Sequence, residues 1–160
     1  MRTLVVYYSN EGNTEAAARK IASELSADLL KLVPEKDIPK EGFFRFFTGG
    51  MKASFGLGAK LKKYDLKWSE YSQIILGTPI WASSPCPAVN QFLKEIPDTS
   101  KITSIFTFSG GGDNDKCMQI FRRKIPGLRN SVALCDKKNP EHSKDNDPKL
   151  KGFIEGCKSV

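Results

Sequence analysis

Residues Val5 to Leu25 read VVYYSNEGNTEAAARKIASEL, and the character of this stretch changes twice along its length. It begins with a β-branched and aromatic run that is typical of a buried strand. It ends with a segment rich in Ala, Glu, Lys and Arg, in which Ala17, Ile21 and Leu25 fall on one helical stripe. A short polar loop with one glycine lies between the two. The pattern predicts a strand over residues 3–8 that leads through a tight loop into a helix over residues 14–26.

The same alternation of strand and helix continues along the chain. Apolar runs and helical spacing predict further strands at 28–33, 73–77, 102–108 and 131–135, and helices at 87–96, 115–125 and 148–157. Because these strands are apolar on both faces, we expect a parallel sheet covered by helices on both sides. The chain has 160 residues, 39% of them hydrophobic, which suits one domain. We therefore expect a single α/β domain over residues 1–160, with ligands bound beyond the carboxyl ends of its strands.

The composition bears on the cellular compartment of the protein and on metal binding. No apolar run approaches the length of a membrane span, and the first residues lack the apolar segment of a signal peptide, so we expect a cytoplasmic protein without membrane insertion. The four cysteines lie far apart without a C-x-x-C spacing, and the single histidine, His142, lies in a polar segment. This pattern argues against a metal site and favours reduced thiols.

The charge of the chain is concentrated in one segment. The formal charge is +7 at a pI of about 9.2, and residues 35–67 hold eight basic and four acidic residues, which is +4 of that total. Such a segment attracts acidic partners, and nucleic acid or an anionic membrane surface belong to that class in principle. A solvated basic face is the simpler interpretation, and we expect no nucleic-acid partner.

The loop after the first predicted strand has the composition of a phosphate-binding turn. Small side chains allow backbone amides to converge, hydroxyl and amide side chains add donors, and the helix N-terminus adds partial positive charge. There is no Walker lysine and no G-x-G-x-x-G, so neither a nucleoside triphosphatase nor a dinucleotide site is indicated. An ordinary turn with Thr14 as the helix N-cap explains this loop alone equally well. The residues concerned are Ser9, Asn10, Glu11, Gly12, Asn13 and Thr14.

Two later loops favour the phosphate interpretation. The third predicted strand is followed by residues 78–85, which carry Trp81 between two prolines, and a Trp beyond a strand end can stack on a flat heteroaromatic ring. The fourth is followed by residues 109–114, whose glycines allow backbone groups to approach a ligand closely. Each loop alone is explained as readily by a loop anchor or a turn. Together with the first loop they predict a site for a phosphorylated planar cofactor.

Three segments in this order and spacing resemble the FMN-binding loops of the flavodoxin-like family: YYSNEGNT (7–14), LGTPIWASSPCPAVNQFLKE (76–95) and TFSGGGD (107–113). The resemblance covers nearly the whole chain. It implies a five-stranded parallel sheet in the order 2-1-3-4-5 and noncovalently bound FMN. The resemblance implies that the phosphate is bound by side chains of Ser9, Asn13 and Thr14 and by the backbone amides of Asn10, Glu11 and Gly12. It implies that Trp81 stacks on the flavin ring, within a loop that flanks the ring and contains Thr78, Pro79, Ile80 and Ala82. It also implies that the polar edge of the ring is lined by Ser109, Gly110, Gly111, Gly112 and Asp113.

The chain departs from the family pattern at three points. Glu11 stands where the family usually has Thr, and we expect its carboxylate to point to solvent because it would repel a phosphate. The third loop has no aromatic residue between Ser109 and Asn114, so one face of the flavin would stay open. Flavodoxins are typically acidic and this chain is basic, so its partner should carry the opposite sign or the docking face should be locally acidic.

These features leave three hypotheses for function. The first is an FMN-binding electron carrier that passes electrons to a redox partner protein or a small-molecule acceptor. The second is an NAD(P)H-dependent flavin or quinone reductase, which an open flavin face would permit. The third is a binding module with a weak or vestigial flavin site. None of them needs a protein acid or base, so we nominate no catalytic side chain, and either a monomer or a homodimer is compatible with the sequence.

Residues 34–66 are the part of the sequence least explained by this pattern. Phe43, Phe44, Phe46 and Phe47 surround Arg45, and glycines and lysines follow. A helix-containing excursion packed on the domain is one interpretation. A flap over the flavin, a dimer contact and a weak membrane-surface or partner element are the others.

Overall fold

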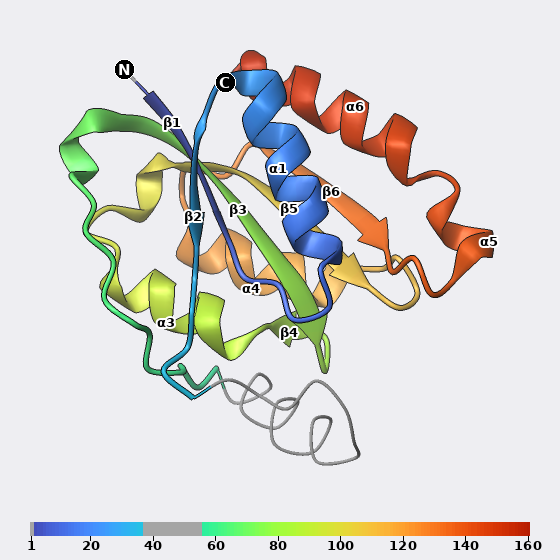
Figure 1. Cartoon of the computed structure of the whole chain (residues 1–160), viewed down its shortest axis with the longest axis horizontal. Coiled ribbons are helices and arrows are strands. Elements are labelled where there is room, and N and C mark those ends of the chain that lie inside the picture. Colours follow the sequence, from blue (N-terminus) through green and yellow to red (C-terminus); the bar gives the residue numbers. More distant parts are fainter. Residues whose placement is uncertain (1, 37–55) are drawn as a thin grey trace.

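A computed structural model describes residues 2–36 and 56–160, and its ribbon is shown in Figure 1. The strands are β1 (Arg2–Tyr7), β2 (Asp28–Lys31), β3 (Tyr71–Trp81), β4 (Ser84–Pro85), β5 (Ile102–Ser109) and β6 (Asn130–Cys135). The α-helices are α1 (Asn13–Leu25), α3 (Pro87–Glu95), α4 (Asp115–Lys124), α5 (Pro140–Ser143) and α6 (Asn146–Lys158), and two 3₁₀ turns, η2 (Trp68–Glu70) and η3 (Thr99–Lys101), precede β3 and β5. Every strand and helix predicted from periodicity is present, with ends that differ by a few residues.

The strands form one sheet in the order β2-β1-β3-β5-β6, and all of these neighbours are parallel. The two-residue β4 pairs only with β3, in the antiparallel sense. Counted without β4, the parallel strands follow the expected order 2-1-3-4-5. The chain therefore reverses its winding direction between β1 and β3, and the carboxyl ends of these two strands lie next to each other.

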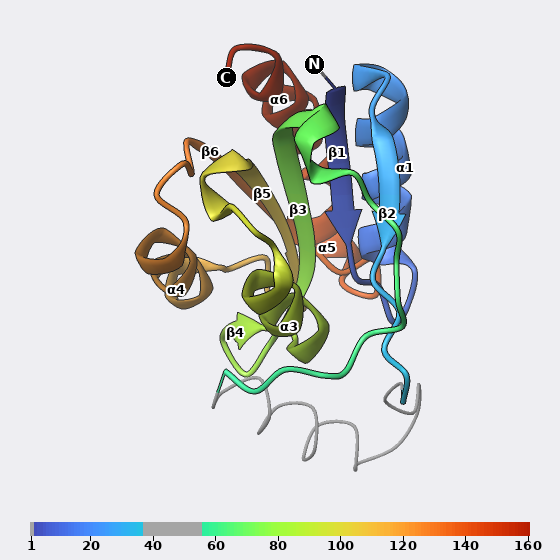
Figure 2. The same ribbon diagram turned by 90° about the vertical axis from the view of Figure 1, so that its left-hand side faces the viewer.

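Helices cover both faces of the sheet (Figures 1 and 2). Val5 and Tyr7 of β1 pack on the side of α1 and α6, in a buried cluster with Ile21 and Phe153. The alternate residues of β1 point to the opposite face, which α3 and α4 cover, and join a second buried cluster there. Period-two alternation with apolar residues on both faces is what a central parallel strand requires.

Strand β3 is longer than predicted. Residues 73–77 were expected to be the strand and 78–85 a loop, whereas the strand runs to Trp81 and turns back into β4. Pro79 is tolerated because β1 stops pairing with β3 at Gly77, so that at position 79 only β5 pairs with β3. The hairpin turn places Ala82 and Ser83 at φ 47° and 61°, a left-handed conformation that these residue types do not signal in a sequence.

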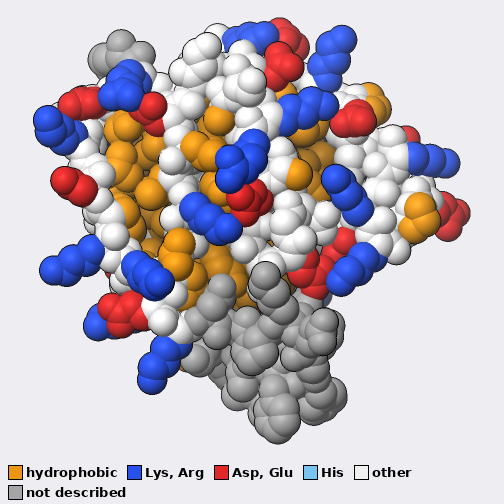
Figure 3. Space-filling view, viewed as in Figure 1, with side chains coloured by type: hydrophobic (Ala, Val, Ile, Leu, Met, Phe, Trp, Pro, Cys, Tyr) orange, Lys and Arg blue, Asp and Glu red, His pale blue; other side chains and the backbone are white. Residues whose placement is uncertain are grey.

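The described part of the segment after β2 runs along the edge of the domain. Leu61 forms an isolated antiparallel bridge with Pro34 and is buried. Lys60 pairs with Glu35 at 3.0 Å, so part of the basic character of this segment is neutralised locally. In Figure 3 basic and acidic side chains are interspersed, and hydrophobic side chains gather between β2 and this segment. The Phe-rich part of the segment lies outside the described residues.

Membrane crossing can be tested directly on the helices. Within residues 2–36 and 56–160, none of them combines the length and the apolar character that a bilayer span requires.

Candidate functional site

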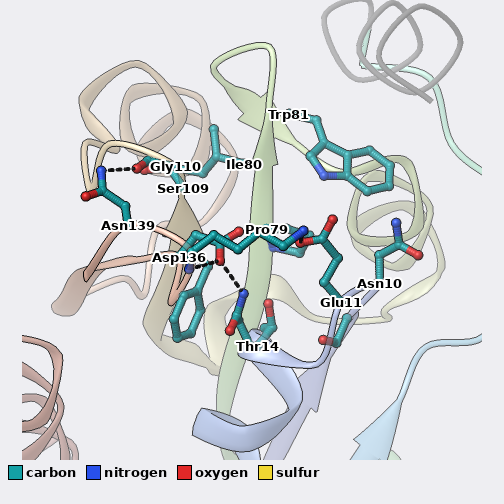
Figure 4. A pocket seen from close by; sticks show the side chains of 14 residues that line it. Asn10, Glu11, Thr14, Pro79, Ile80, Trp81, Ser109, Gly110, Asp136 and Asn139 are labelled. Atoms are coloured by element: carbon teal, nitrogen blue, oxygen red, sulfur yellow. Dashed lines mark hydrogen bonds and ion pairs between the residues drawn. The ribbon is translucent and has the colours of Figure 1, made fainter. Parts of the chain in front are cut away.

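Loops that follow four strands meet at one cavity of about 530 Å³ beyond the carboxyl edge of the sheet. This volume lies within the range of small-ligand sites. Figure 4 shows Trp81 and Asn10 on one side of the cavity, and Ser109, Gly110 and Asn139 on the other. The lining residues are Ser9, Asn10, Glu11, Asn13, Thr14, Pro79, Ile80, Trp81, Phe108, Ser109, Gly110, Asp136, Lys138 and Asn139.

The first loop is closed by a hydrogen bond within it. The Gly12 N–H donates to Ser9 Oγ at 3.1 Å, and Gly12 adopts φ 95°, which a residue with a side chain rarely does. Helix α1 begins at Asn13, so Thr14 is inside the helix and buried, and the interpretation of Thr14 as N-cap is wrong. Within the described part of the chain, no side chain caps α1. Its first backbone amides are therefore available to an anion at the cavity.

The expectation that Glu11 points to solvent is also wrong. Its side chain is only 19% exposed, and its Oε2 accepts a hydrogen bond from Lys138 Nζ at 2.9 Å. The carboxylate is thus drawn against the cavity by a cation from a loop far away in the sequence. A carboxylate that is paired with a lysine is neutralised locally, so it repels an anion less than an isolated one.

Asn10 has the buried polar group that most directly indicates a ligand. Both polar atoms of its side-chain amide, Nδ2 and Oδ1, are inaccessible to solvent and have no hydrogen-bond partner among the described residues. Buried amides without partners are rare because each costs roughly 1–3 kcal/mol. Asn10 lines the cavity next to Trp81, so a bound molecule with polar groups would satisfy it (Figure 4). Only the backbone amide of Asn10 was expected to take part.

The end of β3 supplies the apolar wall. Pro79, Ile80 and Trp81 line the cavity, and the Trp81 indole lies perpendicular to the Tyr8 ring with centroids 5.8 Å apart. Thr78 was expected to flank the flavin ring, but it is fully buried. Its hydroxyl lies within hydrogen-bond distance of Pro79 O and Cys86 Sγ. Ala82 lies in the hairpin turn and does not line the cavity.

The third loop borders two cavities. Ser109 and Gly110 line the main one, whereas Gly111 and Gly112 do not. Asp113 lines a second cavity of about 290 Å³, and its carboxylate accepts a hydrogen bond from the Asp115 N–H at 3.0 Å. Ile80 and Ser109 line both cavities, so the two adjoin each other.

A thiol also borders the second cavity. Burial, assisted by the neighbouring Cys86, raises the pKa of Cys117 to about 12, so this thiol is neutral at physiological pH. Only thiolates are strong nucleophiles, and Cys117 therefore does not mark a nucleophilic site.

Residues 136–139 form a fourth segment at the cavity, which the sequence did not reveal. The Asp136 N–H donates to Ser109 O at 2.9 Å, and its Oδ1 accepts from Asn13 Nδ2 at 2.9 Å. Asn139 Nδ2 donates to Gly110 O at 3.1 Å, which Figure 4 shows as a dashed line. This segment therefore ties the first loop to the third. Its sequence, DKKN, is polar and has no glycine, so only its place after a parallel strand could have suggested it.

Comparison with known proteins shows the fold. No protein-family model matches the chain. No curated protein matches it either. Solved structures do match. A protein of Bacteroides eggerthii that has been assigned as a flavoprotein has a TM-score of 0.72 and 20% identity, with 95% of this chain and 97% of that chain covered.

Two further solved structures are similar to this chain. A flavoprotein of Lactobacillus acidophilus in complex with FMN has a TM-score of 0.66 and 20% identity, with coverage of 92% and 97% of the two chains. A protein of P. pentosaceus titled as an NADPH-quinone reductase has a TM-score of 0.57 and 14% identity, with coverage of 100% and 99%. The chain thus has a flavodoxin-like fold.

Proposed function

We propose that this chain binds FMN and acts as a flavodoxin-like electron carrier. The observation that carries the proposal is the convergence of four strand ends on one cavity. Its wall holds the indole of Trp81 and the side-chain amide of Asn10, which has no hydrogen-bond partner among the described residues. The similarity to a flavoprotein that was crystallised with FMN supports it.

The residues at the cavity fit a phosphorylated flavin. The uncapped start of α1 and the Ser9–Gly12 turn would hold the phosphate through backbone amides. Asn10 offers an NH₂ group that donates and a carbonyl oxygen that accepts, which suits hydroxyl groups of a ribityl chain. Trp81 would stack on the ring system, and Ser109 with Gly110 would line its polar edge. The bound flavin supplies the electron-accepting chemistry, and the protein binds and orients it.

The test is flavin binding by the purified protein. We expect flavin absorbance, or a titration in which FMN binds more tightly than FAD. Stacking on a base contributes roughly 1–3 kcal/mol, so Trp81→Ala should weaken FMN binding by about 5- to 150-fold. Trp68→Ala is the matched control, because Trp68 packs against Tyr64 and Phe92 and does not line the cavity. No flavin binding at micromolar concentrations would overturn the proposal and favour a binding module with a vestigial site.

A reductase is the second candidate. The third loop carries no aromatic side chain, and the adjoining second cavity extends beside Ile80 and Ser109, which suits a second planar molecule. The similarity to the protein titled as an NADPH-quinone reductase supports this alternative. Steady-state oxidation of NADH or NADPH by the FMN-loaded protein, with a quinone as acceptor, separates the two. Turnover favours the reductase, and its absence together with tight FMN binding favours the carrier.

A further inference from the structure

The charges at the main cavity are poorly balanced for an anionic ligand. Among the described residues that line it, Glu11 and Asp136 are acidic and Lys138 is the one basic residue. A phosphate monoester carries close to two negative charges at neutral pH. Backbone amides offer only partial positive charge, so among the described residues of the cavity wall a ligand of this kind finds one full cation to pair with.

The main chain of Lys138 is held firmly at the cavity, whereas its side chain is not. The N–H of Lys138 donates to Asp136 Oδ1 at 3.0 Å, and the next residue, Asn139, donates to the backbone oxygens of Asp136 and Gly110. The Lys138 side chain is 74% exposed, and its ammonium donates to Glu11. A lysine ammonium has three donors on a flexible stem, so it can contact a second oxygen or exchange partners without moving the main chain.

Glu11 sets where this ammonium lies. It belongs to the first loop, directly before Gly12, and its side chain, which is 19% exposed, lines the cavity. The ion pair therefore brings the Lys138 charge to the same loop whose amides would receive a phosphate. An arriving dianion attracts the ammonium more strongly than a single carboxylate does.

We propose that Lys138 is the side chain that recognises the FMN phosphate, and that Glu11 positions its ammonium at the first loop. This inference rests on the proposed flavin-binding function and deepens it. It assigns the preference for FMN over flavins without phosphate to a residue beyond β6, outside the three loops that resemble the FMN-binding loops of the flavodoxin-like family.

The test compares FMN with riboflavin, which lacks the phosphate. Dissociation constants for both are measured by flavin fluorescence for the wild type, Lys138→Met and the control Lys137→Met, a neighbouring lysine that does not line the cavity. We expect Lys138→Met to weaken FMN binding at least tenfold, which is about 1.4 kcal/mol, and to change riboflavin binding less than twofold. Lys137→Met should change neither. Thermal unfolding verifies that each variant is folded, and Lys138→Gln is the alternative if Met at this exposed position causes aggregation.

The Glu11→Gln background separates a direct contact from mere neutralisation of Glu11. In the Glu11→Gln background the carboxylate no longer positions the ammonium, so we expect Lys138→Met to weaken FMN binding less than it does in the wild type, but still at least threefold. If the double variant binds FMN as tightly as Glu11→Gln alone, Lys138 acts only on Glu11 and the inference is wrong. Equal loss of FMN and riboflavin in Lys138→Met would also overturn it. If the wild type binds neither flavin, the proposed function itself fails, and the inference fails with it.

Discussion

Replacement of Gly77 by Ala tests whether the packing under the site is as tight as the structure indicates. Gly77 lies in β3 at a negative φ, so Ala is acceptable to the backbone, and only space opposes it. A Cβ at this position would lie 2.1 Å from Cζ of Phe106, and 2.6 and 2.7 Å from two further ring atoms. Phe106 is fully buried and packs on Phe153, with ring centroids 6.1 Å apart.

The expected cost follows from these distances. Ordinary contact begins near 3.4 Å, so ring and strand must separate by about 1.3 Å in a core that has no room to give. Overpacking of this kind costs about 2–3 kcal/mol, which corresponds to a fall in melting temperature of about 4–12 °C for a chain of this length. Urea unfolding followed by circular dichroism gives the free energy of unfolding directly.

Two further variants make this prediction refutable. Gly152→Ala in α6 is the matched control, because a Cβ there meets nothing within 4 Å, and we expect it to stabilise the helix by up to about 1 kcal/mol. Phe106→Leu removes the ring atoms that clash with the new Cβ. The loss of unfolding free energy in the double variant Gly77→Ala/Phe106→Leu should therefore be smaller than the sum of the two single losses, by at least about 1 kcal/mol. A Gly77→Ala protein within about 0.5 kcal/mol of the wild type, or strict additivity, would refute the reasoning.

Two other predictions concern ionisation. Hydrogen bonds from Lys31 and Arg19 lower the pKa of Glu15 from 4.5 to about 2, so this carboxylate stabilises the folded protein above pH 4.5 and loses that effect as the pH falls towards 2. We therefore expect Glu15→Gln to lower the free energy of unfolding in urea by about 0.5–1 kcal/mol at pH 7 and not to change it near pH 2. An equal loss at both pH values would contradict this assignment. All four thiols are buried, and burial raises the pKa of Cys117 and of Cys157. A thiol-specific disulfide reagent at pH 8 should therefore react slowly with the native protein, and promptly with four thiols in denaturant. A fast reaction of the native protein would show that a thiol is accessible.

The parallel sheet could be predicted because its signal is local. Runs such as ITSIFTF are apolar on both faces, and the helices between them carry one apolar stripe. The residues of each element therefore indicate which of its faces are buried. The β3–β4 hairpin could not be predicted, since Ala82 and Ser83 adopt positive φ values without glycine. The pairing of Trp81 with Ser84 leaves a two-residue hairpin turn, which requires positive φ values whatever residues occupy it.

The candidate site was predictable only where the residues after a strand carry a signal of their own, such as small polar residues, a tryptophan or glycines. The structure brings residues of the first loop, the end of β3 and Ser109–Gly110 together at one cavity, and all of them were named from the resemblance. The placement of Glu11 was wrong because its partner, Lys138, lies 127 residues away, and an ion pair of that separation leaves no trace in local sequence. Asp136 and Asn139 were missed for the same reason.

The hydrogen bonds between the first loop and residues 136–139 also determine when the cavity is completed during synthesis of the chain. Asn13 bonds to a residue 123 positions later, and Glu11 to one 127 positions later, so the wall of the cavity is incomplete until most of the chain has left the ribosome. A molecule that needs the whole cavity can bind only the finished fold, and it then stabilises that fold by mass action. Nascent chains and fragments cut before residue 136 would not retain it. Ligand capture would thus distinguish complete copies of this protein from unfinished ones.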